Sequence, residues 1–249
     1  MSSISLGAPF RIGPALSRAF SIFSADVGKF VALSLMAWAP FLLAEFAGLV
    51  GRTPVEGDSL ATILFPAFLG IALVMVLSAI SHAVCLYGAY QVMRERQFSV
   101  GESLRAGLAR TGPVIGASLL AGLAVLIALL LLIVPGIIVM CMIYVALPAC
   151  VIEKLGPVAS LTRSRALTKG YRWQLFGLLL IVTIATSIVT YGIRYVLGQT
   201  LGLAPTQLVT FGWQVIANAF GAVLVAVVYH DLRVAREGVD IEKLANVFD

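Results

Sequence analysis

Long apolar stretches, separated by short polar and basic ones, set the pattern of this chain. Five stretches contain at most one Asp, Glu, Lys or Arg: residues 31–50, 59–93, 111–152, 173–193 and 195–230. About 20 apolar residues in a helix cross the hydrocarbon core of a bilayer, so each stretch is long enough for at least one crossing. Because the stretches are continuously apolar, they predict membrane helices, whereas strands of a membrane barrel would alternate apolar and polar residues.

The stretch 111–152 is long enough for two crossings. Pro135 and Gly136 lie inside it and predict a helix break and a tight turn. We therefore predict an all-α fold, a polytopic membrane helical bundle that forms a single domain over residues 1–249. Its six predicted transmembrane helices and its tail cover about residues 30–51, 62–93, 112–134, 136–152, 173–198, 207–230 and 231–249.

Three lead-in segments precede the three pairs of spans, which suggests a repeated unit. Short sequence echoes support it: IGPALSRAF at 12–20 aligns with VGESLRAGL at 100–108, and SRAF at 17–20 aligns with SRAL at 164–167. In the first segment, apolar residues at helical spacing predict an interfacial helix over 13–29. These residues are Leu16, Ala19, Phe20, Phe23, Val27 and Phe30. The second segment has a narrower stripe of Val100, Leu104 and Leu108.

Lys and Arg are strongly biased toward one side of the predicted membrane. The first 30 residues, 94–110, 153–172 and the tail hold 15 of the 17, and the other side holds only Arg52 and Arg194. Since positive residues remain in the cytoplasm, we predict that both termini are cytoplasmic. The first apolar span is too long for a secretory signal and has no short basic region before it, so we expect the N-terminal segment to be retained.

Composition and charge narrow the class of protein further. A mean hydropathy of +1.02 with only 12% charged residues excludes an ordinary soluble domain. The formal net charge of +5 is then explained by topology and by an anionic lipid surface, so we expect no nucleic acid partner. Cys85, Cys141 and Cys150 all lie inside predicted spans without CxxC or CxxH spacing, so we expect no metal site, disulfide framework or cofactor.

The segment SLTRSRALTKGYRW, residues 160–173, carries four cations: Arg163, Arg165, Lys169 and Arg172. No acidic residue lies between Glu153 and Asp231, so the counter-charge of these cations must lie elsewhere. We predict that they anchor the topology and contact anionic lipid headgroups. Anchoring alone is the alternative, and Trp173 at the start of a span fits both roles.

A few polar residues inside the spans are candidates for chemistry. Their conventional role is helix packing, since such residues hydrogen-bond between membrane helices. The alternatives are that His82 relays protons or binds a ligand, and that Gln214 and Asn218 line a polar path. Glu45 and Arg194 lie at similar predicted depths, where they either pair or extend separately to the outer surface. Gln214 and Asn218 share one helix face. The candidates are Glu45, His82, Arg194, Gln214 and Asn218.

The segment VPGIIVMCMIYVALPACVIEKLGPVASLTRSRALTKGYRWQLFGLLL contains a Pro-Gly pair, a second Pro, a Gly-Pro pair and a Ser-x-x-Leu-Thr-x-Gly motif followed by Trp. The chain ends with YHDLRVAREG, which supplies Tyr229, Asp231, Leu232, Arg233, Glu237 and Gly238. These features resemble the membrane-domain family associated with bacterial glycerophosphoryl diester phosphodiesterases. The resemblance covers most of residues 10–240 and implies a six-span protein of the bacterial cytoplasmic membrane.

Some members of that family are fused to a catalytic phosphodiesterase domain. The 249 residues here leave no room for one beside six spans, so we expect no enzyme activity. A noncatalytic membrane module that binds lipid or a membrane or cytoplasmic protein partner is therefore our first hypothesis. A small-solute or lipid transporter or channel subunit is the alternative, and an intramembrane lipid enzyme ranks third because clustered acids, histidines or a nucleophile are missing from the sequence.

Overall fold

The computed structural model describes residues 10–47, 49, 59–94, 98–200 and 202–237. This part of the chain forms ten helices and no strand. They are α1 (Ile12–Ala25), α2 (Val27–Phe46), α3 (Leu60–Met93), α4 (Val100–Ala109), α5 (Thr111–Leu131), α6 (Ile133–Ile143), α7 (Ala146–Ile152), α8 (Pro157–Thr168), α9 (Arg172–Thr200) and α10 (Leu203–Glu237). Six helical segments are long and apolar enough to cross a membrane, with α6 and α7 together forming one of them. The predicted all-α, six-span class is confirmed.

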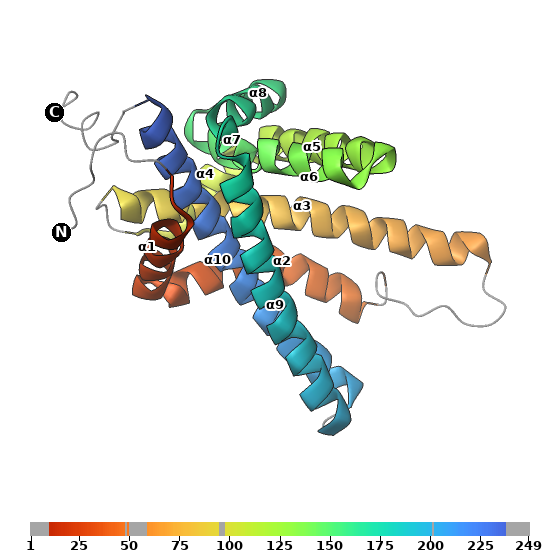
Figure 1. Ribbon diagram of the computed structural model, residues 1–249. Helices are drawn as coiled ribbons and strands as arrows, with labels where there is room; N and C mark the ends of the chain where they lie inside the picture. Colours follow the sequence, from red (N-terminus) through yellow and green to blue (C-terminus); the bar gives the residue numbers. More distant parts are fainter. Residues whose placement is uncertain (1–9, 48, 50–58, 95–97, 201, 238–249) are drawn as a thin grey trace.

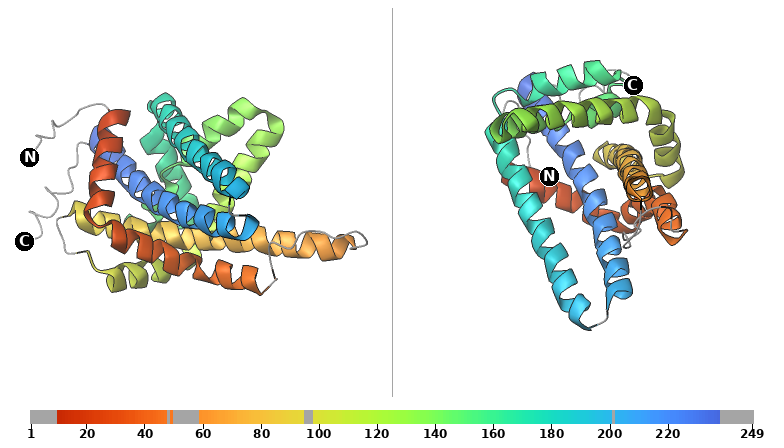
Figure 2. Two further views of the ribbon diagram at one scale, coloured as in Figure 1. Left: turned by 90° about the horizontal axis from the view of Figure 1, so that it is seen from below. Right: turned by 90° about the vertical axis from the view of Figure 1, so that its right-hand side faces the viewer.

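The helices form three hairpins, α2–α3, α5–α6 and α9–α10, that extend from one shared end (Figures 1 and 2). The lead-in helices α1, α4 and α8 lie at this end, as does the C-terminal part of α10 (Figure 1). Away from it the hairpins splay apart. Nearly all described charged residues belong to the shared end, which we call the charged end.

Small residues let the central helices pack closely near the charged end. Ala83 and Ala89 of α3 and Ala222 and Ala226 of α10 are all buried in the core. At Gly107 of α4, an added Cβ would lie 2.5 Å from the side chain of Val84 and 3.0 Å from its backbone. The backbone of α4 therefore lies directly on α3, which a larger residue would prevent.

The break between the third and fourth spans differs from the prediction. Leu132 is the extended residue, and α6 already begins at Ile133. Pro135 and Gly136 belong to the first turn of α6, where a proline is tolerated because the amides of that turn have no helical acceptor. A Cβ at Gly136 would lie 3.1 Å from the Cα of Leu129, so this glycine allows α5 and α6 to pack closely.

Two predicted boundaries at the charged end are also corrected. The interfacial helix predicted over 13–29 ends at Ala25, and α2 begins at Val27 without a loop between them. The last helix does not end at 230 but continues to Glu237. The residues predicted as the start of a tail therefore keep helical spacing and project from the last turns of α10.

Candidate functional site: the charged end

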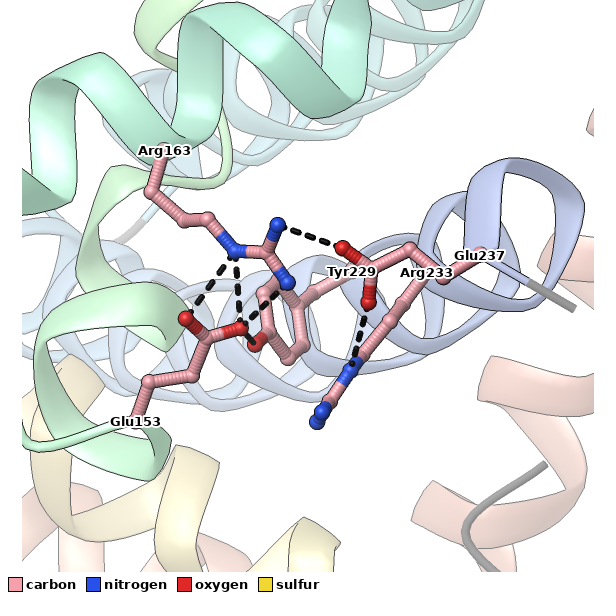
Figure 3. A network of polar contacts seen from close by, with 5 residues as sticks. All are labelled: Glu153, Arg163, Tyr229, Arg233 and Glu237. Atoms are coloured by element: carbon pink, nitrogen blue, oxygen red, sulfur yellow. Dashed lines mark hydrogen bonds and ion pairs between the residues drawn. The ribbon is translucent and has the colours of Figure 1, made fainter. Parts of the chain in front are cut away.

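Arg163 of α8 is the centre of an ion-pair network (Figure 3). Its Nε donates to both carboxylate oxygens of Glu153 at 2.9 Å, and its Nη1 lies 2.5 Å from Oε1 of Glu237. Glu237 also accepts from Nε of Arg233 at 3.2 Å, and the hydroxyl of Tyr229 donates to Glu153. The network thus joins the end of α7, the middle of α8 and the last turns of α10.

The hydrogen bond to Glu237 and the charge of Glu153 raise the pKa of Arg163 above its ordinary value, although partial burial opposes the shift. Its counter-charge therefore comes from inside the protein. Because both acceptors are already bound to it, Arg163 differs from the other three cations of residues 160–173, which have no described ion-pair partner.

The C-terminal motif is largely a set of contacts between helices. Besides the network of Figure 3, Asp231 pairs with Nη1 of Arg18 at 2.5 Å, so α10 is also fastened to α1. Tyr229 and Leu232 are fully buried. Gly238 lies outside the described residues. The motif residues thus hold the lead-in helices to the last hairpin.

Most described carboxylates are neutralised within the protein. Asp26 pairs with Lys29 at 2.8 Å, and Asp231, Glu153 and Glu237 pair with arginines. Glu102 accepts instead from the hydroxyl of Tyr87. Several cations remain exposed on the charged end: Arg11, Arg105, Lys154, Arg165, Lys169 and Arg236. The exposed charges of the charged end that have no partner in the described part of the chain are consequently mostly positive.

Each lead-in helix also exposes one large apolar side chain near these cations. They are Phe20 of α1, Leu108 of α4 and Val158 of α8, and Trp173 at the start of α9 is 84% exposed. Phe20 was predicted on the same stripe as Ala19 and Phe23, but only those two are buried. Similarly, Leu108 is exposed while the small residues Ser103 and Gly107 pack inward. Apart from Phe23 of α1 and Leu167 of α8, the lead-in helices rest on the bundle through small residues, and each presents a larger apolar residue outward.

A second function of α8 is to complete a broken helix. Pro148 has no N–H for the carbonyl of Tyr144, and the helix is interrupted between α6 and α7 at Tyr144 and Val145. Ser164 accepts from the backbone N–H of Val145 at 3.2 Å and donates to the carbonyl of Met142 at 2.8 Å. Thr168 donates to the same carbonyl at 3.3 Å. The Ser and Thr of the Ser-x-x-Leu-Thr-x-Gly motif thus satisfy backbone groups that the break leaves unpaired.

The interior polar residues form a small network between α2, α3 and α10. Ser81 donates to Oδ1 of Asn218 at 3.0 Å, its hydroxyl lies 3.1 Å from that of Ser34, and Ser34 donates to the carbonyl of Val215 at 3.2 Å. Asn218 therefore has the interhelical role expected of it. His82 does not: its Nδ1 lies 2.9 Å from the carbonyl of Ser78 in its own helix. Sequence reasoning missed the two serines, which carry no distinguishing pattern.

The other candidates do not meet in a site. Gln214 and Arg194 are both exposed, and among the described residues Gln214 forms no hydrogen bond with Asn218. The side chain of Glu45 lies outside the described residues, so its pairing with Arg194 stays a prediction. Near Arg194, Tyr191 and Tyr195 are also exposed, and Nε1 of Trp213 donates to Thr190 at 3.1 Å. This end of the last hairpin thus carries a band of aromatic residues.

Among the described residues, no group of three or more His, Cys, Asp or Glu could hold a metal ion. No family model, curated protein or solved structure matches this chain.

Proposed function

We propose that this multi-pass membrane protein is a noncatalytic module whose charged end faces the cytoplasm and binds anionic lipid. One observation carries the proposal: the carboxylates of the charged end are mostly paired internally, while six cations remain exposed beside outward apolar side chains. Such a surface suits the boundary between anionic headgroups and acyl chains. Each cation near an anionic leaflet contributes about 1 kcal/mol of attraction to it. Several cations together therefore attract anionic lipid without a specific binding pocket.

The length of α9 supports this placement in the bilayer. Trp173 and Tyr191 are 18 residues apart in the sequence, which corresponds to about 27 Å along a helix and approaches the roughly 30 Å of a hydrocarbon core. Trp and Tyr concentrate at the two interfaces of a membrane. The bond between Trp213 and Thr190 puts Trp213 at the level of Tyr191, so both helices of this hairpin support the same outer boundary.

Localisation in a bacterial cytoplasmic membrane is part of the proposal, together with membership in the membrane-domain family that the sequence resembles. The motif residues support that membership because they have connected structural roles: Ser164 and Thr168 complete the broken helix, while Tyr229 and Glu237 join α10 to α7 and α8. We do not favour a transporter, because the polar residues suggested for a path are dispersed between the interior and the exposed surface.

The test compares lipid retention in two charge-reversal variants. The protein is purified in mild detergent from mixed phosphatidylglycerol and phosphatidylcholine, and retained lipid is counted by native mass spectrometry. We expect enrichment of phosphatidylglycerol around the parent protein and a several-fold loss in the double variant R165E/K169E. R194E, at the opposite end, is the matched control and should retain the enrichment. Equal retention of both lipids by the parent protein would refute the proposal, as would unchanged enrichment in a correctly inserted R165E/K169E.

A further inference from the structure

The turn between α8 and α9 has a geometry that sets it apart from the rest of the charged end. Helix α8 ends at Thr168, Lys169 is extended, and Gly170 has φ +91°, a conformation that favours glycine. The N–H of Tyr171 donates to the carbonyl of Thr168 at 3.0 Å, and α9 begins at Arg172. The chain therefore reverses within a few residues, with a cation on each side of the turn.

A third cation reaches the same turn from the end of α10. A Cβ added at Gly170 would lie 3.4 Å from Nη2 of Arg236, so the guanidinium lies against the glycine. The Cζ of Arg236 is 5.9 Å from the ring centroid of Tyr171, which is a cation–π contact. The same ring is also contacted by Phe10, edge-on at 6.2 Å between centroids. Aromatic packing thus holds Arg236 beside the turn.

These three cations have no ion-pair partner in the part of the chain that the structure describes. The two carboxylates closest to Arg236 along α10, Asp231 and Glu237, are bound by other arginines. The Nε of Arg172 is buried and has no hydrogen-bond partner there, while Lys169 and Arg236 are exposed. The turn therefore concentrates positive charge, and the hydrogen-bond donors of these cations have no described acceptor within the protein.

We propose that Lys169, Arg172 and Arg236 form a binding site for the phosphate of one anionic phospholipid, with Tyr171 as its aromatic support. Guanidinium groups bind phosphate oxygens with paired, charge-assisted hydrogen bonds, and a lysine adds a mobile positive charge. Trp173, two residues from Tyr171, exposes its indole at the first turn of a membrane-length helix. A lipid phosphate fits this arrangement better than a soluble anion, because its acyl chains would lie beside α9.

The site rests on the proposed function but differs from general attraction to an anionic surface. It predicts one tightly retained lipid that depends on residues of this turn rather than on any exposed cation. Substitution of Arg236 distinguishes a specific site from general attraction. This residue is distant in sequence from residues 160–173 and lies beside them only because of the fold.

The experiment titrates phosphatidylglycerol into full-length protein in lipid-free detergent and follows one-lipid occupancy by native mass spectrometry. We expect one high-affinity lipid, with affinity at least tenfold lower in R236Q and in K169Q. R105Q removes an exposed cation of α4 and should bind as the parent protein does. R236K keeps the charge but not the paired donors, and its affinity should fall between those of the parent protein and R236Q.

Three results would overturn the site. Equal losses in R236Q and R105Q would mean diffuse attraction, which leaves the proposed function standing. Displacement of the lipid by millimolar inorganic phosphate would identify a soluble-anion site. Absence of any preference for phosphatidylglycerol over phosphatidylcholine in the parent protein would refute the site and the proposed function together. Circular dichroism and a thermal melt of each variant separate these outcomes from loss of folding.

Discussion

Replacing Ser164 with alanine tests whether α8 holds the broken helix together. The Ser164 side chain is fully buried, and its hydroxyl is the described acceptor for the backbone N–H of Val145, which is also buried. In S164A that N–H loses its described hydrogen-bond acceptor. The carbonyl of Met142 still has the hydroxyl of Thr168 at 3.3 Å, although that hydroxyl lies closer to the carbonyl of Ser164, at 2.9 Å. The N–H of Val145 is therefore the group that S164A leaves without any partner.

The expected cost follows from that unpaired group. A buried donor left without a partner costs about 1–3 kcal/mol, and in an apolar surrounding water cannot replace the bond. We therefore expect S164A to lower the free energy of unfolding by about 1–3 kcal/mol. The double variant S164A/T168V orphans the Met142 carbonyl as well, so its loss should exceed the sum of the two single losses.

Ser160 provides the matched control. It is equally buried on the same helix, but its hydroxyl donates only to the carbonyl of Pro157 in its own first turn, at 2.7 Å. S160A should therefore change stability by less than about 1 kcal/mol. Reversible unfolding in mixed micelles, followed by circular dichroism, measures both variants, and amide exchange at Val145 reports the local opening. If S164A were as stable as S160A and Val145 remained protected, the backbone of the break would not depend on α8.

Two further predictions concern packing and the ion-pair network. G107A should destabilise the protein, because its Cβ would lie 2.5 Å from the side chain of Val84. In G101A, on the same helix, the added Cβ meets nothing within 4 Å, so this control should be neutral or stabilising by up to about 1 kcal/mol. Equal or opposite shifts of the unfolding midpoint in the two variants would contradict the close approach of α4 to α3. Y229F removes the hydroxyl that donates to Glu153 and should lower the free energy of unfolding by about 1.5–3 kcal/mol in the same assay. Y195F, at an exposed position, is the control and should leave stability unchanged. An equally neutral Y229F would show that Arg163 alone satisfies Glu153.

The spans could be predicted from sequence because the requirement behind them is local. A continuous apolar run of sufficient length must be helical in lipid, and all six such segments are found. The break near residue 135 could not be placed in the same way. A proline is compatible with both a turn and the first turn of a helix, and only the packing of Gly136 against Leu129 distinguishes the two.

The charged end was predictable in composition but not in its contacts. The sequence suggested that no neighbouring acid neutralises Arg163, yet Glu153, ten residues earlier, does so in part. Its second partner, Glu237, comes within reach only because α10 continues past 230. The family-like motif singled out Tyr229 and Glu237 without assigning them a role. Ser164 gave no local sign of its function, since a helix break that it repairs lies 19 residues earlier in the chain.

Hairpins α2–α3 and α9–α10 pack together from the charged end as far as the network of Ser34, Ser81 and Asn218, and this has a consequence for the lipid around them. Arg163 and Asp231 connect helices at the charged end, whereas the opposite ends of the hairpins diverge (Figures 1 and 2). The part of the chain that the structure describes is therefore narrow at the charged end and broad where the hairpins diverge. Acyl chains are as apolar as leucine side chains, so in a membrane lipid would fill the spaces between the diverging hairpins. We therefore expect the spacing of the hairpins away from the charged end to depend on the lipid around them.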